Sequence, residues 1–380
     1  MNIEAPQSQA QFSQSGRADG DAGTTIVDCD VHPVVPGGLV PLYPLMPKAW
    51  GERFRMKTER APNILPLTFR FEHPSGSAAR HDAATPSGGP AGSDPEYMRK
   101  DLLDANNISL AVLTSLQAGQ MGTVISGPDE SVVICSAYND YFLDVWPLKT
   151  EKRLRLAMTV TAQDPQAAAA EIRRIGKRPE VCAVYMPLIN ILMGNRYYEP
   201  IYKEAVNHGL PILLHVTGTD SVHYGAPNQA GGFPENYPER YVSLAQIGEA
   251  NLTSLCFSGV FEKFPTLKFI FAEYSFAWAL PLMWRINRTW ESLRYDVPWV
   301  KRPPREYVSE RVRFSTQPLD EPNNPEYLKQ LIAMLGPEHL VFSTDYPHWD
   351  NDFPAQSLLM LDKAVRKQIL GENALKVLRI

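Results

Sequence analysis

The sequence predicts a (β/α)8 barrel, and three observations lead to that fold. Eight short apolar runs alternate with stretches of helical periodicity from residue 24 to the C-terminus. Continuous apolar runs bounded by turn residues are typical of parallel strands buried on both faces, and alternation with helices indicates βαβ units. No G-x-G-x-x-G sequence follows the first run, so an open dinucleotide-binding sheet lacks its signature. Eight units in one chain therefore favour a closed barrel.

The predicted elements follow the chain in the order that such a barrel requires. A first strand at residues 24–30 leads directly to His32. Residues 34–94 show no strong periodicity and include the low-complexity stretch 75–93, so we interpret them as a long insertion after the first strand. Further strands are expected at 108–114, 154–160, 181–188, 211–216, 268–274, 312–315 and 340–344. Helices are expected at 95–106, 128–146, 165–175, 200–208 and 240–264, between and after the later strands, and finally at 374–380.

The chain is expected to form a single barrel domain preceded by a tail. Residues 1–23 are rich in Gln, Ser, Ala and Gly and contain no apolar core, which is typical of a disordered segment. We therefore assign residues 24–380, the insertion included, to one metal-dependent barrel domain.

Composition and charge exclude several classes of protein. The 37 basic and 42 acidic side chains give a net charge of −5, so the basic surface of a nucleic-acid-binding protein is absent. No apolar run reaches the ~18 residues that a transmembrane helix needs. The 4 cysteines include no C-x-x-C pair, which favours small buried residues in a reducing compartment. We expect a cytoplasmic protein without nucleic-acid or membrane partners that forms a homo-oligomer, a dimer.

Polar side chains stand at the ends of several predicted strands, where the chemistry of a (β/α)8 barrel is located. Asp30 and His32 end the first strand, His215 the fifth, Glu273 the sixth and Asp345 the eighth. A buried carboxylate or imidazole is unfavourable unless it is paired, and a divalent ion would pair with all of them. Such ligands suit zinc, iron or manganese. We predict that these five residues hold one or two metal ions.

Other polar and aromatic residues are weaker candidates. Asp28 is expected one layer deeper, as a hydrogen-bonding residue behind the ligands. His348 follows Asp345 in a turn, where it is a candidate catalytic residue that contacts substrate or orients a ligand, and the alternative is that it stabilises the turn. The residues expected to contact substrate are Tyr274, Trp278, Arg285, His223 and Trp349. The alternatives are core packing for the aromatic residues, a structural ion pair for Arg285 and an exposed loop position for His223.

Four sequence segments resemble a known family. They are I-V-D-C-D-V-H-P at 26–33, L-L-H at 213–215, F-S-T-D-Y-P-H at 342–348 and I-L-G-E-N-A at 369–374. The chain resembles the amidohydrolase superfamily, in the amidohydrolase-related branch that includes enzymes like aminocarboxymuconate-semialdehyde decarboxylase. The resemblance implies a metal-bearing barrel, with metal ligation by Asp30, His32, His215 and Asp345.

Two positions depart from the pattern of that family. The first strand usually carries His-x-His, and here Asp30 takes the first place. Many decarboxylases of the family carry a His at the end of the sixth strand, where this chain has Glu273. The missing imidazole argues against decarboxylation and supplies another carboxylate, either as a second-metal ligand or as a base.

The sequence therefore favours a metal-dependent hydrolase of a small carboxyl-derived substrate. Metal-activated water would attack an amide, ester or thioester carbonyl, with Asp345 as the general base and Glu273 as a ligand or helper base. The alternative is a metal-dependent nonoxidative decarboxylase of an aromatic or unsaturated carboxylic acid. A third hypothesis is an inactive barrel that serves as a binding module.

Overall fold

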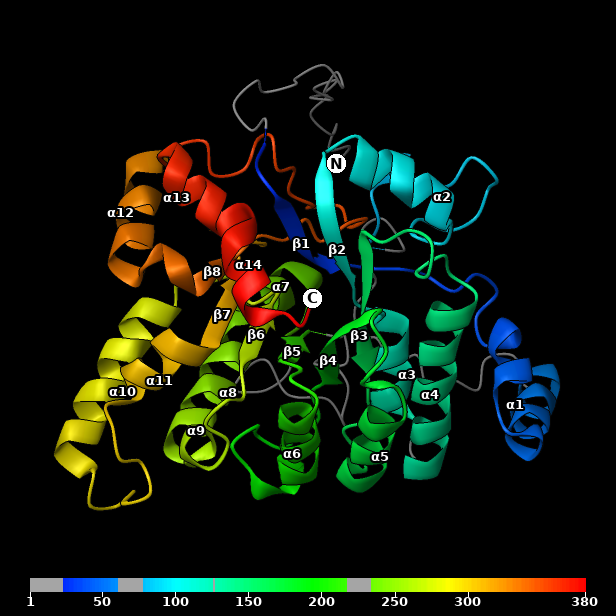
Figure 1. The fold of residues 1–380 in the computed structure, drawn as a ribbon, viewed down its shortest axis with the longest axis horizontal. Helices are drawn as coiled ribbons and strands as arrows, with labels where there is room; N and C mark the ends of the chain where they lie inside the picture. The colour runs from blue at the N-terminus through cyan, green and yellow to red at the C-terminus, as the bar shows by residue number, and fades with distance from the viewer. Residues whose placement is uncertain (1–22, 61–77, 126, 217–233) are drawn as a thin grey trace, which may run out of the picture.

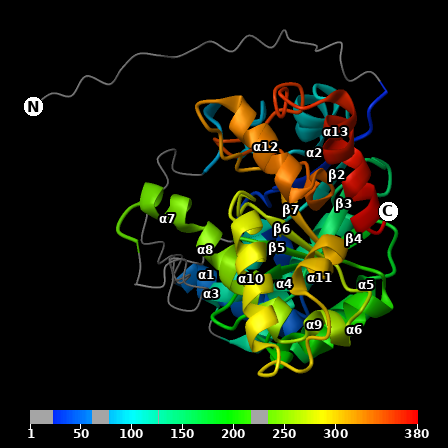
Figure 2. The same cartoon turned by 90° about the vertical axis from the view of Figure 1, so that its left-hand side faces the viewer.

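The computed structural model of the protein describes residues 23–60, 78–125, 127–216 and 234–380. Eight strands of this part form one parallel sheet in the sequential order β1 to β8, which confirms the predicted (β/α)8 barrel. Figure 1 and Figure 2 show helices surrounding the strands. The strands are β1 (Ile26–Val31), β2 (Ile108–Leu113), β3 (Leu154–Thr159), β4 (Val181–Pro187), β5 (Ile212–His215), β6 (Phe269–Ala272), β7 (Val312–Ser315) and β8 (Leu340–Val341).

The segment after β8 closes the barrel against β1. The backbone N–H of Asp345 donates to the carbonyl of Asp30 at 3.1 Å, and the N–H of His32 donates to the carbonyl of Tyr346 at 2.8 Å. The parallel pairing with β1 thus continues past the end of β8, where Tyr346 pairs with Val31. Three of the predicted metal ligands therefore lie along one seam of the barrel.

Proline and short polar caps define where several helices begin. The side chain of Asp164 accepts hydrogen bonds from two backbone N–H groups at the start of α5, and Asn324 caps α12, each directly before a proline. The helices are α1 (Lys48–Arg60), α2 (Pro95–Met98), α3 (Leu116–Val124), α4 (Pro128–Asp144), α5 (Pro165–Ile175), α6 (Glu199–Asn207), α7 (Tyr237–Ser243), α8 (Ala245–Phe257), α9 (Val260–Lys263), α10 (Ala279–Leu293), α11 (Pro304–Arg311), α12 (Pro325–Leu335), α13 (Lys363–Lys367) and α14 (Asn373–Val377). Within the described residues, none of them is long and apolar enough to cross a membrane.

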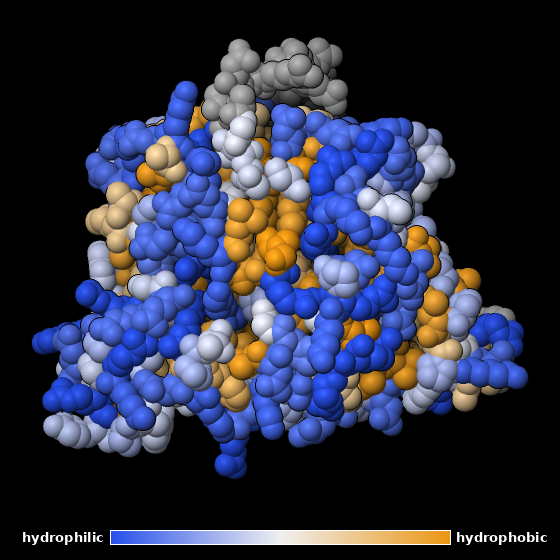
Figure 3. Space-filling model, in the orientation of Figure 1, coloured by the Kyte–Doolittle hydropathy of each residue, from blue (hydrophilic) through white to orange (hydrophobic). Residues whose placement is uncertain are grey.

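Two apolar layers stabilise the barrel. An inner layer includes Leu213 and Ile270 of neighbouring strands, and a larger layer fills the space between strands and helices. Ala374 and Val377 of α14 join the inner layer, and the backbone N–H of Arg379 donates to the carbonyl of Cys182 near the start of β4. The C-terminal segment therefore covers the end of the barrel at which the strands begin, opposite the mouth at which they end. All four cysteines are buried and free, as predicted. On the face drawn in Figure 3, apolar side chains gather near the centre and hydrophilic ones cover most of the rest.

The insertion after β1 is partly ordered against the barrel. It contains α1, where the rings of Trp50 and Phe54 stack at 6.3 Å. The last part of the insertion includes the stretch predicted to be of low complexity. It packs beside the mouth of the barrel, where Ala79 forms an antiparallel bridge with His348. Residues 1–22 of the predicted tail and residues 61–77 of the insertion lie outside the described residues.

Two helices were not among those predicted, α1 in the insertion and α3 after β2. Helix α3 was not expected, because Gly119 and Gly122 weaken its helical pattern. Packing explains both glycines: a Cβ on Gly119 would lie 2.2 Å from the Tyr185 hydroxyl, and one on Gly122 would lie 2.8 Å from a cysteine sulfur. The helical patterns expected at 240–264 correspond to α7, α8 and α9. Gly259, with a φ of 77°, separates the last two.

Replacing Gly371 with alanine should lower the free energy of unfolding by about 1–3 kcal/mol, the usual effect of overpacking. A Cβ on this residue would lie 2.0 Å from the backbone carbonyl oxygen of Thr25, at the start of β1. Denaturant unfolding followed by circular dichroism measures the change. Gly127→Ala is the control, because its Cβ would meet no atom closer than 3.5 Å. Equal unfolding midpoints for the two variants would contradict the prediction.

Candidate metal centre

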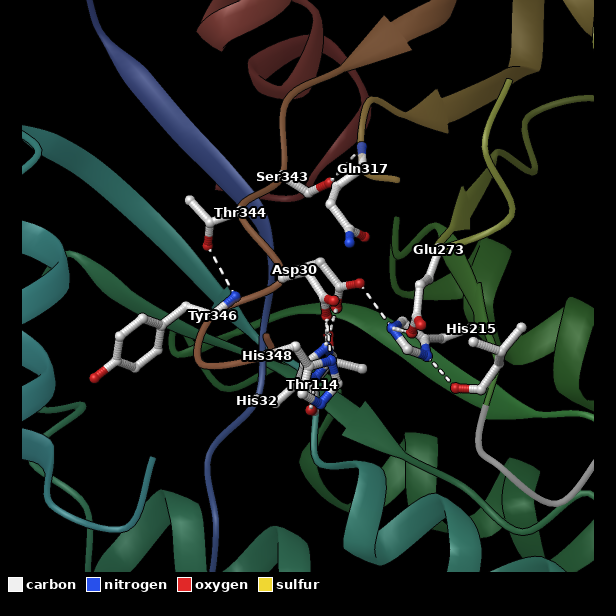
Figure 4. A network of polar contacts seen from close by, with 12 residues as sticks. Asp30, His32, Thr114, His215, Glu273, Gln317, Ser343, Thr344, Tyr346 and His348 are labelled. Carbon is white, nitrogen blue, oxygen red and sulfur yellow. Dashed lines mark hydrogen bonds and ion pairs between the residues drawn. The ribbon is translucent and has the colours of Figure 1, made fainter. Parts of the chain in front are cut away.

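The structure brings four predicted ligands together at the mouth of the barrel. Asp30, His32, His215 and Asp345 are all buried, and each offers one ligand atom within 4.8 Å of the others. His215 Nε2 lies 2.8 Å from Asp30 Oδ2, and His32 Nε2 lies 2.6 Å from Asp345 Oδ1. Figure 4 shows Asp30 and His32, from β1 and the residue that follows it, lying close to His215 from β5. Their positions at β1, β5 and the segment after β8 are those that the strand-end argument requires.

Several polar atoms of this cluster have no hydrogen-bond partner. Among the described residues, Asp30 Oδ1, His215 Nε2 and Asp345 Oδ2 are buried without a hydrogen-bond partner, and His215 Nε2 has only carboxylate oxygens of Asp30 and Glu273 within ion-pair distance. Buried polar atoms in folded proteins are almost always paired, so three exceptions around one centre need a common explanation. Two imidazole nitrogens and two carboxylates form a donor set that suits a divalent transition metal. The cluster therefore fits the predicted ion.

Backbone carbonyls fix which nitrogen each histidine presents to the cluster. His32 Nδ1 donates to the carbonyl of Thr114 at 3.0 Å, and His215 Nδ1 donates to the carbonyl of Val216. A carbonyl only accepts, so the proton must be on Nδ1 in both rings. The Nε2 atoms are consequently directed at the centre, an arrangement typical of metal-binding histidines.

A second group of ligand atoms overlaps the first. Glu273 and His348 lie close enough to His32 and Asp345 to form another potential metal-binding set. Glu273 Oε2 is 3.2 Å from His215 Nε2, and His348 Nδ1 is 2.8 Å from Asp345 Oδ1. Both side chains predicted to be catalytic beside Asp345 thus border the four-residue cluster.

The pKa values of the side chains in the cluster are shifted because the cluster contains an excess of buried negative charge. Burial alone would raise the pKa of Asp345, but the charges and hydrogen bonds of His348 and His32 hold that pKa well below its usual range. Burial would lower the pKa of His32, but Asp30 and Asp345 raise it to about 9. Burial and the neighbouring carboxylates raise the pKa of Glu273 well above its ordinary value. Protons on His32 and Glu273 thus supply positive charge that a divalent ion would also provide.

Asp28 supports the cluster from behind, as predicted. Its carboxylate accepts hydrogen bonds from the backbone N–H of Thr344 at 2.9 Å and from the Thr344 hydroxyl at 2.6 Å. It also accepts from the N–H of Asp30 at 3.2 Å. Asp28 thereby joins the segment that carries Asp345 to the strand that carries Asp30.

Comparison with known proteins gives evidence that is independent of this geometry. A family model described as Amidohydrolase matches residues 27–380. The chain belongs to the amidohydrolase family. It is 23% identical over 303 residues to 2-amino-3-carboxymuconate-6-semialdehyde decarboxylase of Dictyostelium discoideum, covering 75% of this chain and 76% of that protein. It is 24% identical over 316 residues to gamma-resorcylate decarboxylase of Rhodococcus jostii, covering 76% and 88%.

A solved structure has the same fold. It is a 5-carboxyvanillate decarboxylase of Novosphingobium aromaticivorans in complex with manganese and 4-hydroxy-3-methoxy-5-nitrobenzoic acid. The identity to this amidohydrolase-family chain is 16% and the TM-score is 0.65, with 96% of this chain and 99% of that chain covered.

The preferred prediction from the sequence, a hydrolase of amide, ester or thioester bonds, is wrong. Both curated relatives are decarboxylases, and each matches about three quarters of this amidohydrolase-family chain. They support the decarboxylase alternative instead. The error arose at Glu273, because we treated the absence of a histidine there as evidence against decarboxylation.

The five predicted substrate contacts lie in different surroundings. Trp278 is buried, donates from its indole N–H to the carbonyl of Tyr274 at 2.7 Å and packs its ring 5.4 Å from that of Phe314. Tyr274 is also buried in the apolar layer outside the strands, and a substrate contact for either residue stays a prediction. Arg285 is exposed on α10, which leaves its role a prediction. His223 lies outside the described residues.

The fifth, Trp349, lies near the mouth. Its side chain is about half exposed, and its ring is 5.9 Å from that of Tyr241 on α7. It directly follows His348, which borders the metal-binding cluster. An exposed aromatic ring in this position remains a candidate substrate contact.

Sequence reasoning missed three polar groups near the cluster. Thr114 and Gln317 follow β2 and β7, and Tyr185 lies within β4; each is buried with a polar side-chain atom that has no partner among the described residues. Thr114 and Gln317 stand just after strands, so their position in the sequence could have indicated them as neutral polar groups at the mouth. Nothing in the sequence distinguishes Tyr185 from a core tyrosine.

His215→Ala should abolish tight divalent-metal binding, because it removes one of four ligand atoms from a preformed site. Protein stripped with a chelator, incubated with Mn²⁺ and desalted would be assayed for metal by mass spectrometry. A metal that binds only the folded state also raises stability, by about 2.7 kcal/mol at 100 times its Kd, so the melting temperature is a second measurement. His339→Ala is the control, since His339 bonds Gly336 and Ser309 instead. Full metal loading of His215→Ala would overturn the assignment.

Glu273 has a left-handed backbone, with a φ of 60°, as does Asp345, with a φ of 61°. This conformation is about 1–2 kcal/mol unfavourable for residues other than glycine. Glu273→Gly should therefore be about 1 kcal/mol more stable than Glu273→Ala when metal-free protein is unfolded in denaturant. The same pair at Glu249, on α8, should show the opposite order because alanine favours a helix. Identical orders at both positions would contradict the prediction.

Proposed function

We propose that this chain is a divalent-metal-dependent, nonoxidative decarboxylase of an aromatic or unsaturated carboxylic acid. The observation that carries the proposal is the buried cluster of two histidines and two aspartates with unpaired atoms around a common centre. Both curated relatives are decarboxylases, which supports this reaction over other metal-dependent reactions.

Asp30, His32, His215 and Asp345 would hold the ion. When bound, a zinc, iron or manganese ion would act as a Lewis acid that anchors the substrate carboxylate and a neighbouring oxygen. His348 donates to Asp345 and so holds that carboxylate in place. Thr114 and Val216 keep the two histidines in the tautomer that ligation needs.

The reaction requires a proton at the carbon that loses its carboxylate. The bond between that carbon and the carboxyl carbon breaks, carbon dioxide leaves, and the electron pair that remains on the substrate takes up a proton. Glu273 is the residue we assign to this transfer. Its carboxyl lies 3.2 Å from His215 Nε2, so it borders both the ligands and the space for substrate. Ser315 fixes its position by accepting a hydrogen bond from its backbone N–H at 3.0 Å.

Carbon dioxide release from an aromatic acid tests the reaction itself. Metal-loaded protein incubated with hydroxybenzoates labelled with ¹³C in the carboxyl group should release labelled carbon dioxide. In deuterated water, the product should carry one deuterium at the carbon that lost the carboxylate. Chelator-treated protein should be inactive until metal is restored. Hydrolysis of aryl esters without any decarboxylation across the panel would contradict the proposal.

Glu273→Gln should lower turnover by at least ~100-fold, the lower range for losing general acid–base catalysis, because glutamine keeps the shape but has no transferable proton. Metal content, measured in the same preparation, separates loss of the proton donor from loss of the ion. Glu291→Gln, at an exposed position of α10, serves as the control. Full activity in Glu273→Gln would assign Glu273 a structural role.

A further inference from the structure

Four cationic side chains lie at the end of the barrel where the strands begin, opposite the metal centre. Arg155 and Arg313 are the second residues of β3 and β7, and Lys268 directly precedes β6. Arg379 follows α14, and its backbone N–H donates to the carbonyl of Cys182 near the start of β4. All four side chains are partly buried. We call these four residues the basal cluster.

Strand geometry directs three of these side chains toward the inside of the barrel. Alternate residues of a strand face the same side, so Arg155 faces the same side as Ala157 of the inner apolar layer. Lys268 precedes the inner residue Ile270 by two positions, and Arg313 pairs with Ile270 in register. Because β3 and β7 are four strands apart in the eight-stranded barrel, Arg155 and Arg313 approach its axis from opposite sides.

Electrostatic effects show which members of the basal cluster are close to one another. Burial lowers the pKa of Lys268, and the positive charge of Arg313 lowers it further. Burial raises the pKa of the Cys182 thiol to about 12, and the charges of Arg155 and Arg379 act against that rise. Lys268 Nζ also donates to a backbone carbonyl of α14, which joins it to the C-terminal segment that carries Arg379.

The three guanidinium groups are hydrogen-bonded on one side only. Nη1 of Arg155 and Nη1 of Arg313 each donate to two backbone carbonyls that precede them in the chain, and Nη2 of Arg379 donates to two carbonyls at and just before the start of β4. Nε of each arginine is buried and has no hydrogen-bond partner among the described residues. Arg155 and Arg313 therefore keep open the edge formed by Nε and Nη2, the edge with which arginine holds two oxygens of a carboxylate or phosphate.

In the part of the chain that the structure describes, no carboxylate balances this charge. None of the four cations has a carboxylate oxygen within 4.0 Å. Glu180, at the same end of the barrel, faces Arg178 at 3.5 Å, and the exposed Glu338 acts on Arg313 from beyond ion-pair distance. Partly buried cations are unfavourable without a counter-charge, so the open arginine edges indicate a bound anion.

We propose that the basal cluster binds a phosphate-type oxyanion. A tetrahedral phosphate has enough acceptor oxygens for the open edges of Arg155 and Arg313 together with the ammonium group of Lys268. It carries up to two negative charges, which suit a site of four cations better than the single charge of a carboxylate. The bound anion would join β3, β6 and β7 at the base of the barrel. This inference does not depend on the proposed decarboxylase function, because the basal cluster and the metal centre lie at opposite ends of the strands.

Calorimetry with inorganic phosphate tests this site. Manganese-loaded, full-length protein would be titrated with phosphate at an ionic strength held constant with chloride, and it should show saturable binding. Phosphate also ligates metal ions, so His215→Ala, which should lack the manganese, would be titrated in parallel. This variant should still bind one phosphate per chain. The melting temperature of both proteins should rise with phosphate and not with chloride, because phosphate would bind only the folded state.

Substitutions in the basal cluster assign the binding to its arginines. Arg155→Lys and Arg313→Lys keep the positive charge but lose the two-donor edge, so each should weaken phosphate binding about 10- to 100-fold, the usual effect of losing a hydrogen bond to a charged group. Arg288→Gln is the control, because it removes a positive charge from a side chain of α10 that is 81% exposed. Its phosphate affinity should equal that of the wild type. The melting temperature in chloride verifies that each variant is folded.

Several results would overturn the proposal. The first is phosphate affinity that is unchanged in both lysine variants. The second is the loss of phosphate binding in His215→Ala, which would place the anion on the metal. Equal weakening in Arg288→Gln would mean general charge attraction without a site. If a lysine variant does not fold, the melting temperatures of the wild type and His215→Ala decide, and the absence of a rise with phosphate would exclude the site.

Discussion

The concentration of negative charge at the mouth of the barrel is the constraint on which the rest of the site depends. Asp30, Asp345 and Glu273 share a buried volume in which isolated carboxylates are strongly unfavourable. The protein responds to that charge in three ways. Imidazoles form hydrogen bonds to Asp345, the pKa of Glu273 is raised so that its carboxyl group holds a proton, and the pKa of His32 is raised. The backbone carbonyls behind the histidines and the Asp28 contacts behind Asp345 then become supports for a charge-dense centre.

The strand pattern predicted both the fold and most of this centre. Asp30, His32, His215 and Asp345 could be assigned because parallel strands end at the same side of a barrel, so a residue's place at a strand end determines its neighbours in space. Gln317 was missed because a neutral side chain shows no charge that needs pairing. Helix α3 was missed because its glycines serve a contact with Tyr185 that no local pattern reveals. The reaction was misread at Glu273, since a residue type alone does not say whether a carboxyl group ligates, accepts or donates a proton.

Glu273 and Asp345 share a backbone feature as well as a charge. Both follow their strands in the left-handed conformation, which turns each carboxyl away from the direction that the strand would give it. Strained residues of this kind persist where the surrounding contacts determine the geometry, and they gather at functional sites. Here the contacts are the hydrogen bond from the Glu273 N–H to Ser315 and the pairing of Asp345 with β1.

The bridge between Ala79 and His348 links the insertion to the chemistry of the site. The N–H of Trp349 donates to the carbonyl of Ala78 at 2.8 Å, and the N–H of Arg80 donates to the carbonyl of Pro347 at 2.9 Å. The loop that carries His348 is therefore paired with β1 on one side and with the insertion on the other. The insertion and this loop form one mechanical unit, so a change in the packing of the insertion would also displace His348 next to the Asp345 carboxylate.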